Sequence, residues 1–133
     1  MTEGTVGEVG RELIERYWAC ARARDWSGFG ALLHPEVVYE VPQTRERVRG
    51  REAYVEFNAT WPDDWDADVL EVIAEGERGF SRIAFYPNRF DRSQVQHGLC
   101  VFGFRDGLIA HLLDYWPEPY EPPARHGGSV ERY

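Results

Sequence analysis

Cysteine is scarce in this sequence of 133 residues, which contains only Cys20 and Cys100. Both lie among apolar neighbours and are interpreted as small buried side chains, although the sequence alone leaves a pairing between them open. No apolar run approaches the roughly 20 residues that a membrane-spanning helix needs. Residues 1–17 are polar and acidic, unlike a signal peptide. We therefore expect a cytoplasmic protein that does not enter a membrane.

Positive charge is also in deficit, because 23 acidic residues outnumber 15 basic ones and give a net charge of −8. This balance argues against binding to nucleic acid, whose phosphates need a basic surface, and against binding to an anionic membrane. Motifs for a phosphate loop, a redox cysteine pair and a nucleophilic serine elbow are missing. The four histidines lack the spacing of metal ligands, so we expect neither a metal site nor a cofactor.

Apolar residues at helical spacing predict three helices in the first half of the chain. The first covers residues 6–24, with Thr5 as its predicted N-cap. A short helix is expected from Trp26 to Leu33, capped by Asp25, and a third helix over residues 51–61.

The second half of the chain alternates apolar and polar residues, as strands do. Asp106 and Gly107 give the strongest hairpin signal, because such a turn needs positive φ angles. Strands are expected at 67–75, 79–88, 95–105 and 108–116, after a short strand at 36–41 and a loop or irregular hairpin at 43–50.

This order of elements predicts an α+β fold: a cone-shaped, curved antiparallel sheet with helices covering its open face and enclosing a pocket. The length predicts one domain over residues 1–133, in which 118–133 form an irregular C-terminal arm rich in proline and glycine.

Several motifs resemble the nuclear-transport-factor-2-like superfamily and, within it, the SnoaL-like branch of polyketide cyclases and ketosteroid isomerases. In chain order they are Arg16-Tyr17, Asp25-Trp26, residues 32–39, residues 50–53, residues 102–109 and Asp114-Tyr115-Trp116. The resemblance covers nearly the whole chain up to Glu118. It implies a cone-shaped α+β barrel and usually a homodimer. It implies no single activity, because the fold serves isomerases, cyclases, epoxide hydrolases, dehydratases and binding proteins.

The resemblance also implies roles for single residues. Tyr17 matches the tyrosine on the first helix of the isomerases that donates to an oxyanion. Val41 and Cys100 stand where those enzymes carry two acids, and Glu40 faces the other side of its strand, which argues against steroid isomerisation. Asp114 matches the acid on the last strand that does the chemistry in the cyclases and epoxide hydrolases. We therefore expect Asp114 and Tyr17 to be the catalytic residues.

Strand alternation places Leu112, Asp114 and Trp116 on one face, which the resemblance makes the pocket face. Apolar neighbours raise the pKa of a carboxyl by desolvation, so Asp114 is a candidate general acid or base. The alternative is an acid at the barrel rim, paired with a loop arginine or with water. Tyr17 is either a hydrogen-bond donor to a ligand or a core tyrosine that bonds to Asp114.

The rest of the predicted pocket is apolar. His34 is interpreted as a structural cap at a helix end, with a place at the cavity mouth as the alternative. His97 and His111 are predicted to face away from the pocket, with a catalytic role for His97 as the alternative. The residues expected to contact the substrate are Val41, Phe57, Trp61, Trp65, Cys100, Phe102, Leu112 and Trp116. The leading hypothesis is a SnoaL-like small-molecule enzyme or ligand-binding protein with an apolar pocket. If it is an enzyme, it carries out cofactor-independent acid/base chemistry, of isomerase, cyclase or hydratase type, on a hydrophobic carbonyl or cyclic substrate. The alternative is a non-catalytic ligand-binding or dimerisation module.

Overall fold

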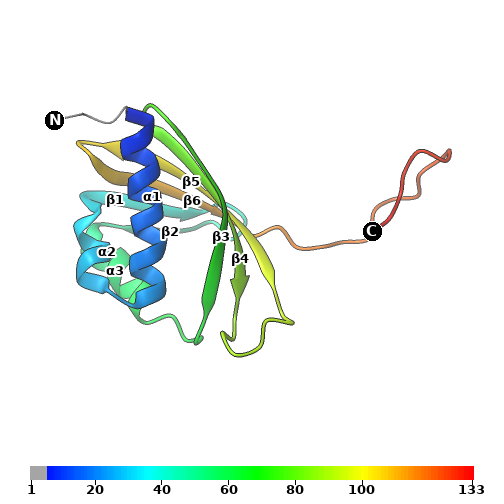
Figure 1. Cartoon of the computed structure of the whole chain (residues 1–133), viewed down its shortest axis with the longest axis horizontal. Coiled ribbons are helices and arrows are strands. Elements are labelled where there is room, and N and C mark those ends of the chain that lie inside the picture. The colour runs from blue at the N-terminus through cyan, green and yellow to red at the C-terminus, as the bar shows by residue number, and fades with distance from the viewer. Residues whose placement is uncertain (1–5) are drawn as a thin grey trace.

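A computed structural model gives the fold and describes residues 6–133 (Figure 1). Its helices are α1 (Val6–Ala23), α2 (Trp26–Ala31) and α3 (Arg51–Ala59). Its strands are β1 (Leu33–Val41), β2 (Glu46–Arg49), β3 (Asp66–Glu75), β4 (Arg78–Tyr86), β5 (Gln96–Arg105) and β6 (Leu108–Tyr115). Every predicted helix and strand is present, with ends that differ by at most three residues. The predicted cap Thr5 lies outside the described residues.

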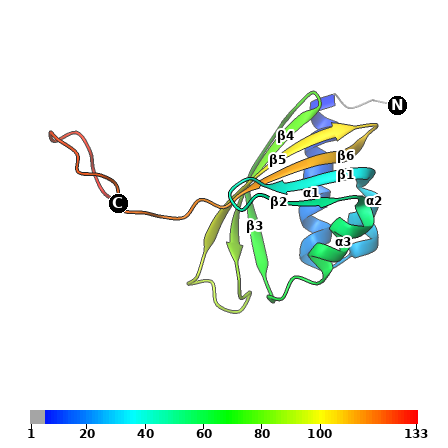
Figure 2. The ribbon, with the colours of Figure 1, turned by 180° about the vertical axis from the view of Figure 1, so that it is seen from behind.

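All six strands form one sheet in the order β2-β1-β6-β5-β4-β3. Four of the five pairings are antiparallel, as expected, but β1 and β6 run parallel. The region left open as a loop or hairpin contains β2, which pairs with β1. Register shifts in the β3–β4 and β5–β6 pairings increase the local twist, and the sheet curves around the helices (Figure 2).

Helix α1 lies across the concave side of the sheet and packs against β3 and β4. Its buried stripe runs through Leu13, Ile14, Tyr17, Trp18 and Ala21, which recur every three or four residues. The turn into α2 is closed as predicted, because an oxygen of the Asp25 carboxylate accepts a hydrogen bond from the backbone nitrogen of Gly28 at 3.0 Å. The helix layer therefore closes the concave side over a single core.

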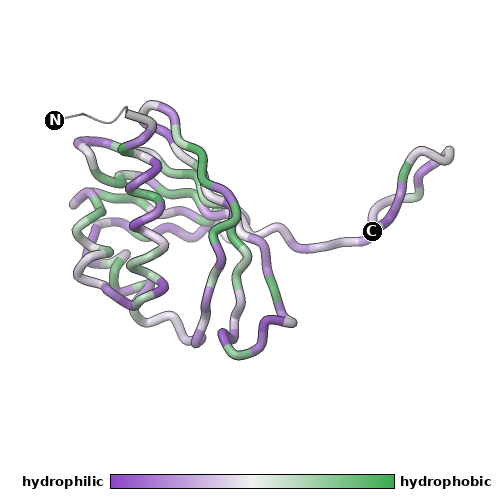
Figure 3. The backbone as a smooth tube through the Cα atoms, in the orientation of Figure 1, coloured by the Kyte–Doolittle hydropathy of each residue, from purple (hydrophilic) through white to green (hydrophobic). Residues whose placement is uncertain are grey.

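The convex side of the sheet is not covered by any helix of the described chain (Figures 1 and 2). Half-buried apolar side chains of neighbouring strands meet there, with Phe80 opposite Val101 and Val101 opposite Leu113. Figure 3 shows hydrophobic residues gathered along the strands and hydrophilic ones in the loop between β4 and β5.

After Tyr115 the chain forms neither helix nor strand and projects away from the body of the molecule (Figure 2). Tyr120 in this arm is 83% exposed, and Arg132 pairs with Glu121 at 2.9 Å. Within residues 6–133, no helix has the length and apolar character that a membrane crossing requires.

Candidate functional site

The β5–β6 hairpin positions the acid that the sequence singled out. Its turn has φ angles of 56° at Asp106 and 71° at Gly107, the paired positive values that a tight hairpin turn requires. The resulting register places Asp114 directly opposite Cys100. The neighbouring side chains alternate as predicted, since Leu112 is fully buried while His111 contacts Glu40 on the other face at 2.7 Å.

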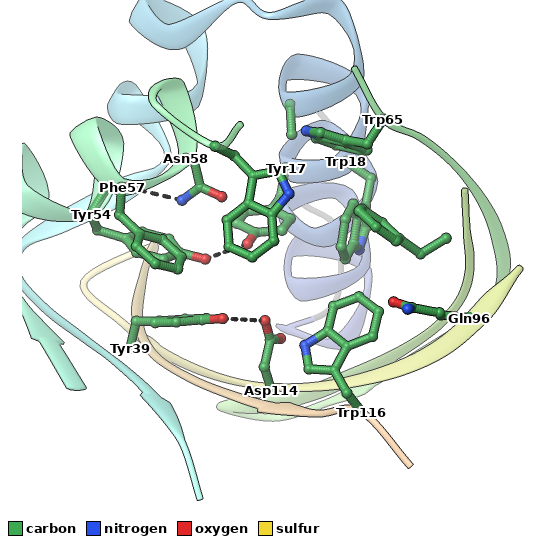
Figure 4. A pocket seen from close by; sticks show the side chains of 13 residues that line it. Tyr17, Trp18, Tyr39, Tyr54, Phe57, Asn58, Trp65, Gln96, Asp114 and Trp116 are labelled. Carbon is green, nitrogen blue, oxygen red and sulfur yellow. Dashed lines mark hydrogen bonds between the residues drawn. The ribbon is translucent and has the colours of Figure 1, made fainter. Parts of the chain in front are cut away.

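Asp114 faces a cavity of about 200 Å³ between the helices and the concave side of the sheet (Figure 4). Side chains from the helix layer and from the sheet contribute: α1, α3 with the loop that follows it, and the strands β1, β4, β5 and β6. The thirteen lining residues are Tyr17, Trp18, Ala21, Tyr39, Tyr54, Phe57, Asn58, Trp61, Trp65, Phe85, Gln96, Asp114 and Trp116.

The carboxyl group of Asp114 is held by neutral hydrogen-bond donors. The Tyr39 hydroxyl donates to its Oδ2 at 2.5 Å, and the neutral side chains of Cys100 and Trp116 lie beside the carboxyl. Burial raises the pKa of Asp114 above its ordinary value, and these polar neighbours, Tyr39 first among them, oppose that rise without cancelling it. Asp114 is therefore an acid whose proton is held more tightly than that of an exposed aspartate.

A second polar group in the cavity is a pair of tyrosines. The Tyr17 and Tyr54 hydroxyl oxygens lie 2.5 Å apart, and both residues are buried. One hydroxyl donates to the other, which leaves one proton of the pair free to donate to a ligand. Burial is the main cause that raises the pKa of both phenols, so they remain protonated donors. The Tyr39 ring stacks on Tyr54 at 4.7 Å, which brings this pair beside the Tyr39–Asp114 hydrogen bond (Figure 4).

Six of the ten residues predicted for the site line the cavity: Tyr17, Phe57, Trp61, Trp65, Asp114 and Trp116. Tyr17 does not bond to Asp114 as one interpretation of the sequence expected, because its hydroxyl is engaged by Tyr54 and the carboxylate is engaged by Tyr39.

The other four predicted residues lie outside the cavity lining. Phe102 and Leu112 face each other across β5 and β6, fully buried, and the Tyr17 ring covers Phe102 at 5.3 Å. Cys100 is buried on β5, directly opposite Asp114 in the β5–β6 pairing, and does not line the cavity. Val41 ends β1, where its carbonyl oxygen accepts from the backbone nitrogen of Arg45 in the turn.

Sequence reasoning missed Tyr39 and Tyr54 as residues of the site. Tyr39 donates to Asp114, and Tyr54 is hydrogen-bonded to Tyr17. The alternation that turned Glu40 outward also turns Tyr39 inward, so the pattern carried this information. On α3, Tyr54 and Asn58 are spaced at i and i+4, the repeat of one helix face. Trp18, another missed lining residue, donates from its indole nitrogen to the buried Ser81 hydroxyl at 3.0 Å.

None of the histidines lines the cavity. The Nδ1 atom of His34 accepts from the backbone nitrogen of Glu36 at 3.0 Å, and His97 is exposed. Glu40, which strand alternation turned away from the pocket, pairs with Arg47 at 2.7 Å. Both cysteine thiols are free, so the open question of a disulfide is answered. Among residues 6–133, no cluster of histidine, cysteine and acidic side chains has the arrangement of a metal site.

Comparison with known proteins identifies relatives of the whole domain. A family model for the SnoaL-like domain matches residues 14–112. A crystal structure of a candidate ketosteroid isomerase from Kribbella flavida superposes with a TM-score of 0.90 at 35% identity, covering 97% of this chain and 93% of that one. No curated protein matches the sequence.

More distant structures share the fold. An LEH-like epoxide hydrolase from Mycobacterium tuberculosis has a TM-score of 0.69 at 17% identity, over 85% of this chain and 86% of its own. A candidate polyketide cyclase from Sinorhizobium meliloti has a TM-score of 0.67 at 21% identity, over 78% of this chain and 94% of its own. The sequence motifs, the curved six-stranded sheet with its three helices and the family match agree, and the chain belongs to the SnoaL-like domain family.

Proposed function

We propose that this protein catalyses cofactor-independent proton transfer on a small hydrophobic carbonyl or cyclic substrate. The observation that carries the proposal is the placement of Asp114 in an aromatic cavity, with its proton affinity raised by burial and with the Tyr17–Tyr54 pair nearby. An acid with a raised pKa inside a cavity is a candidate general acid or base.

The chemistry follows from what each group can do. In its ionised form Asp114 takes a proton from the carbon next to a substrate carbonyl, and the free proton of the tyrosine pair hydrogen-bonds to the oxygen on which negative charge develops. Asp114 then returns the proton to another carbon of the same substrate, which completes an isomerisation. Tyr39 orients the carboxylate through its short hydrogen bond.

The cavity limits the size of the substrate. Its volume of about 200 Å³ lies below the ~300–1,000 Å³ typical of pockets for drug-sized ligands. A substrate of one ring is the best match. Ketosteroid isomerisation is not proposed, because Val41 and Cys100 are not acids and the cavity is small.

We also propose an oligomeric state and a cellular location for the protein. The uncovered convex face, with Phe80, Val101 and Leu113 meeting across three strands, supports a homodimer that packs through this face. Two free thiols suit a reducing cytoplasm. The acidic surface gives no basis for a nucleic-acid or membrane partner.

The direct test is deuterium exchange into small cyclic ketones in heavy water, followed by NMR. The protein should accelerate exchange at the carbon next to the carbonyl, and Asp114→Asn should reduce that acceleration at least 100-fold, the usual scale of general-base catalysis. Asp106→Asn is the matched control, because it makes the same change at an exposed turn where asparagine tolerates the positive φ.

A non-catalytic binding module is the second candidate. It is favoured by the hydrogen bonds that already engage the Asp114 carboxyl and the tyrosine pair without a ligand. Binding of ring compounds in the cavity, with no exchange above the Asp114→Asn level for any ketone tested, would establish this alternative.

A further inference from the structure

Most of the residues that line the cavity are aromatic. Nine of its thirteen residues are phenylalanine, tyrosine or tryptophan. Asp114 is the one acid among them, and the lining contains no arginine, lysine or histidine. Aromatic ring faces carry negative electrostatic potential, so rings gathered around one site attract cations. The lining is therefore suited to a positively charged ligand rather than a negatively charged one.

Asp114 has hydrogen-bond donors but no counter-ion. Its hydrogen-bond donor Tyr39 is neutral, the Cys100 and Trp116 side chains beside it are neutral as well, and within residues 6–133 Asp114 forms no ion pair. A buried carboxylate without a positive partner is costly, and a cationic ligand in the same cavity offsets that cost. The net charge of −8 also attracts cations toward the protein.

The tryptophan rings of the lining differ in how far they are already engaged. The Arg24 guanidinium lies over the Trp65 ring at 4.4 Å and Trp65 stacks on Phe85 at 5.5 Å, so this ring has no free face for a ligand cation. Trp116 meets Phe85 only edge-on at 5.3 Å, and Trp61 is 43% exposed and contacts Phe57. Figure 4 shows Trp116 beside Asp114, so a group held at these rings lies within the field of the carboxylate.

We propose that the natural ligand carries a tertiary or quaternary ammonium group, which contacts Trp61 and Trp116 while the rest of the molecule reaches toward Asp114. The inference rests on the proposed function in taking the same cavity as the ligand site, and it specifies the substrate of that reaction as an amine-bearing compound. It does not depend on catalysis being observed.

The test compares choline with 3,3-dimethylbutan-1-ol, which has the same shape but a carbon in place of the charged nitrogen. Titration followed by NMR of the tryptophan indole protons gives both dissociation constants. Choline should bind at least tenfold more tightly than the neutral alcohol. Equal affinities, tighter binding of the alcohol, or no binding of choline at tens of millimolar would overturn the proposal.

Two variants test which residues give the preference for choline over the neutral alcohol. Trp61→Leu should weaken choline binding severalfold with little change for the alcohol, and unchanged affinity for the alcohol shows that the variant is folded. Asp114→Asn should reduce the preference for choline, while Asp106→Asn should keep it. The two proposals fail separately: exchange into neutral ketones without any preference for choline refutes only this inference, and choline binding without exchange refutes only the catalytic function.

Discussion

Replacing Tyr39 with phenylalanine isolates the contribution of one hydroxyl to the candidate site. The change removes the 2.5 Å hydrogen bond to Asp114 and keeps the ring that stacks on Tyr54. When Asp114 is ionised, the lost bond is one to a charged group and is worth about 1.5–3 kcal/mol. When Asp114 is protonated, the bond is between neutral groups and is worth about 0.5–1.5 kcal/mol.

The loss of stability in Tyr39→Phe should therefore be larger at pH 8 than in acid, and the pKa of Asp114 should rise further above its ordinary value. Urea unfolding over a pH series measures the first effect, and a carbon NMR titration of the Asp114 carboxyl measures the second. Tyr86→Phe is the matched control, since it removes a 2.9 Å hydrogen bond to Asp68, an exposed carboxylate also paired with Arg92. A loss that is independent of pH, or equal to that of the control, would refute the reasoning.

Other predictions follow from burial and close packing. The folded chain retains the Asp114 proton to a higher pH than the unfolded chain, so its stability falls as pH rises from about 3.9 through the raised pKa. Asp114→Asn should therefore be the more stable protein at neutral pH, by about 1.4 kcal/mol per unit of pKa elevation, with no such gain in acid. Trp18→Phe leaves the buried Ser81 hydroxyl without its donor and should cost about 1–3 kcal/mol in urea unfolding. Gly98→Ala puts a methyl group 2.8 Å from the Trp116 ring and should cost about 1–3 kcal/mol and shift the tryptophan fluorescence.

Local sequence patterns predicted the order of helices and strands, because each of these elements is determined by residues that are close to one another in sequence. The Asp106-Gly107 turn has the positive φ angles that its residues favour, and Asp25 caps α2. The parallel pairing of β1 with β6 was not predicted, because it depends on how the chain crosses between strands that are far apart in sequence.

The candidate site could be predicted only in part, because sequence patterns do not give the depth of a side chain or its partner across the cavity. Alternation tells which face a residue occupies but not how deep it lies, so Phe102 and Leu112 were assigned to the lining although both are fully buried and the Tyr17 ring packs on Phe102. The partner of Asp114 depends on which hydroxyl reaches it across the cavity. The hydroxyl that reaches Asp114 is that of Tyr39 on β1 and not that of Tyr17 on α1.

The measurement that tests the central claim most directly is the pH dependence of deuterium exchange into a small cyclic ketone, with the Asp114 titration recorded by NMR on the same protein. The titratable groups that face Asp114 are Tyr17, Tyr39, Tyr54 and Cys100, and burial raises the pKa of all four, so they stay protonated across the range. The account predicts a rate that rises with the ionisation of Asp114 and is lost in Asp114→Asn. A rate that does not follow this ionisation, or that survives the substitution, would contradict it.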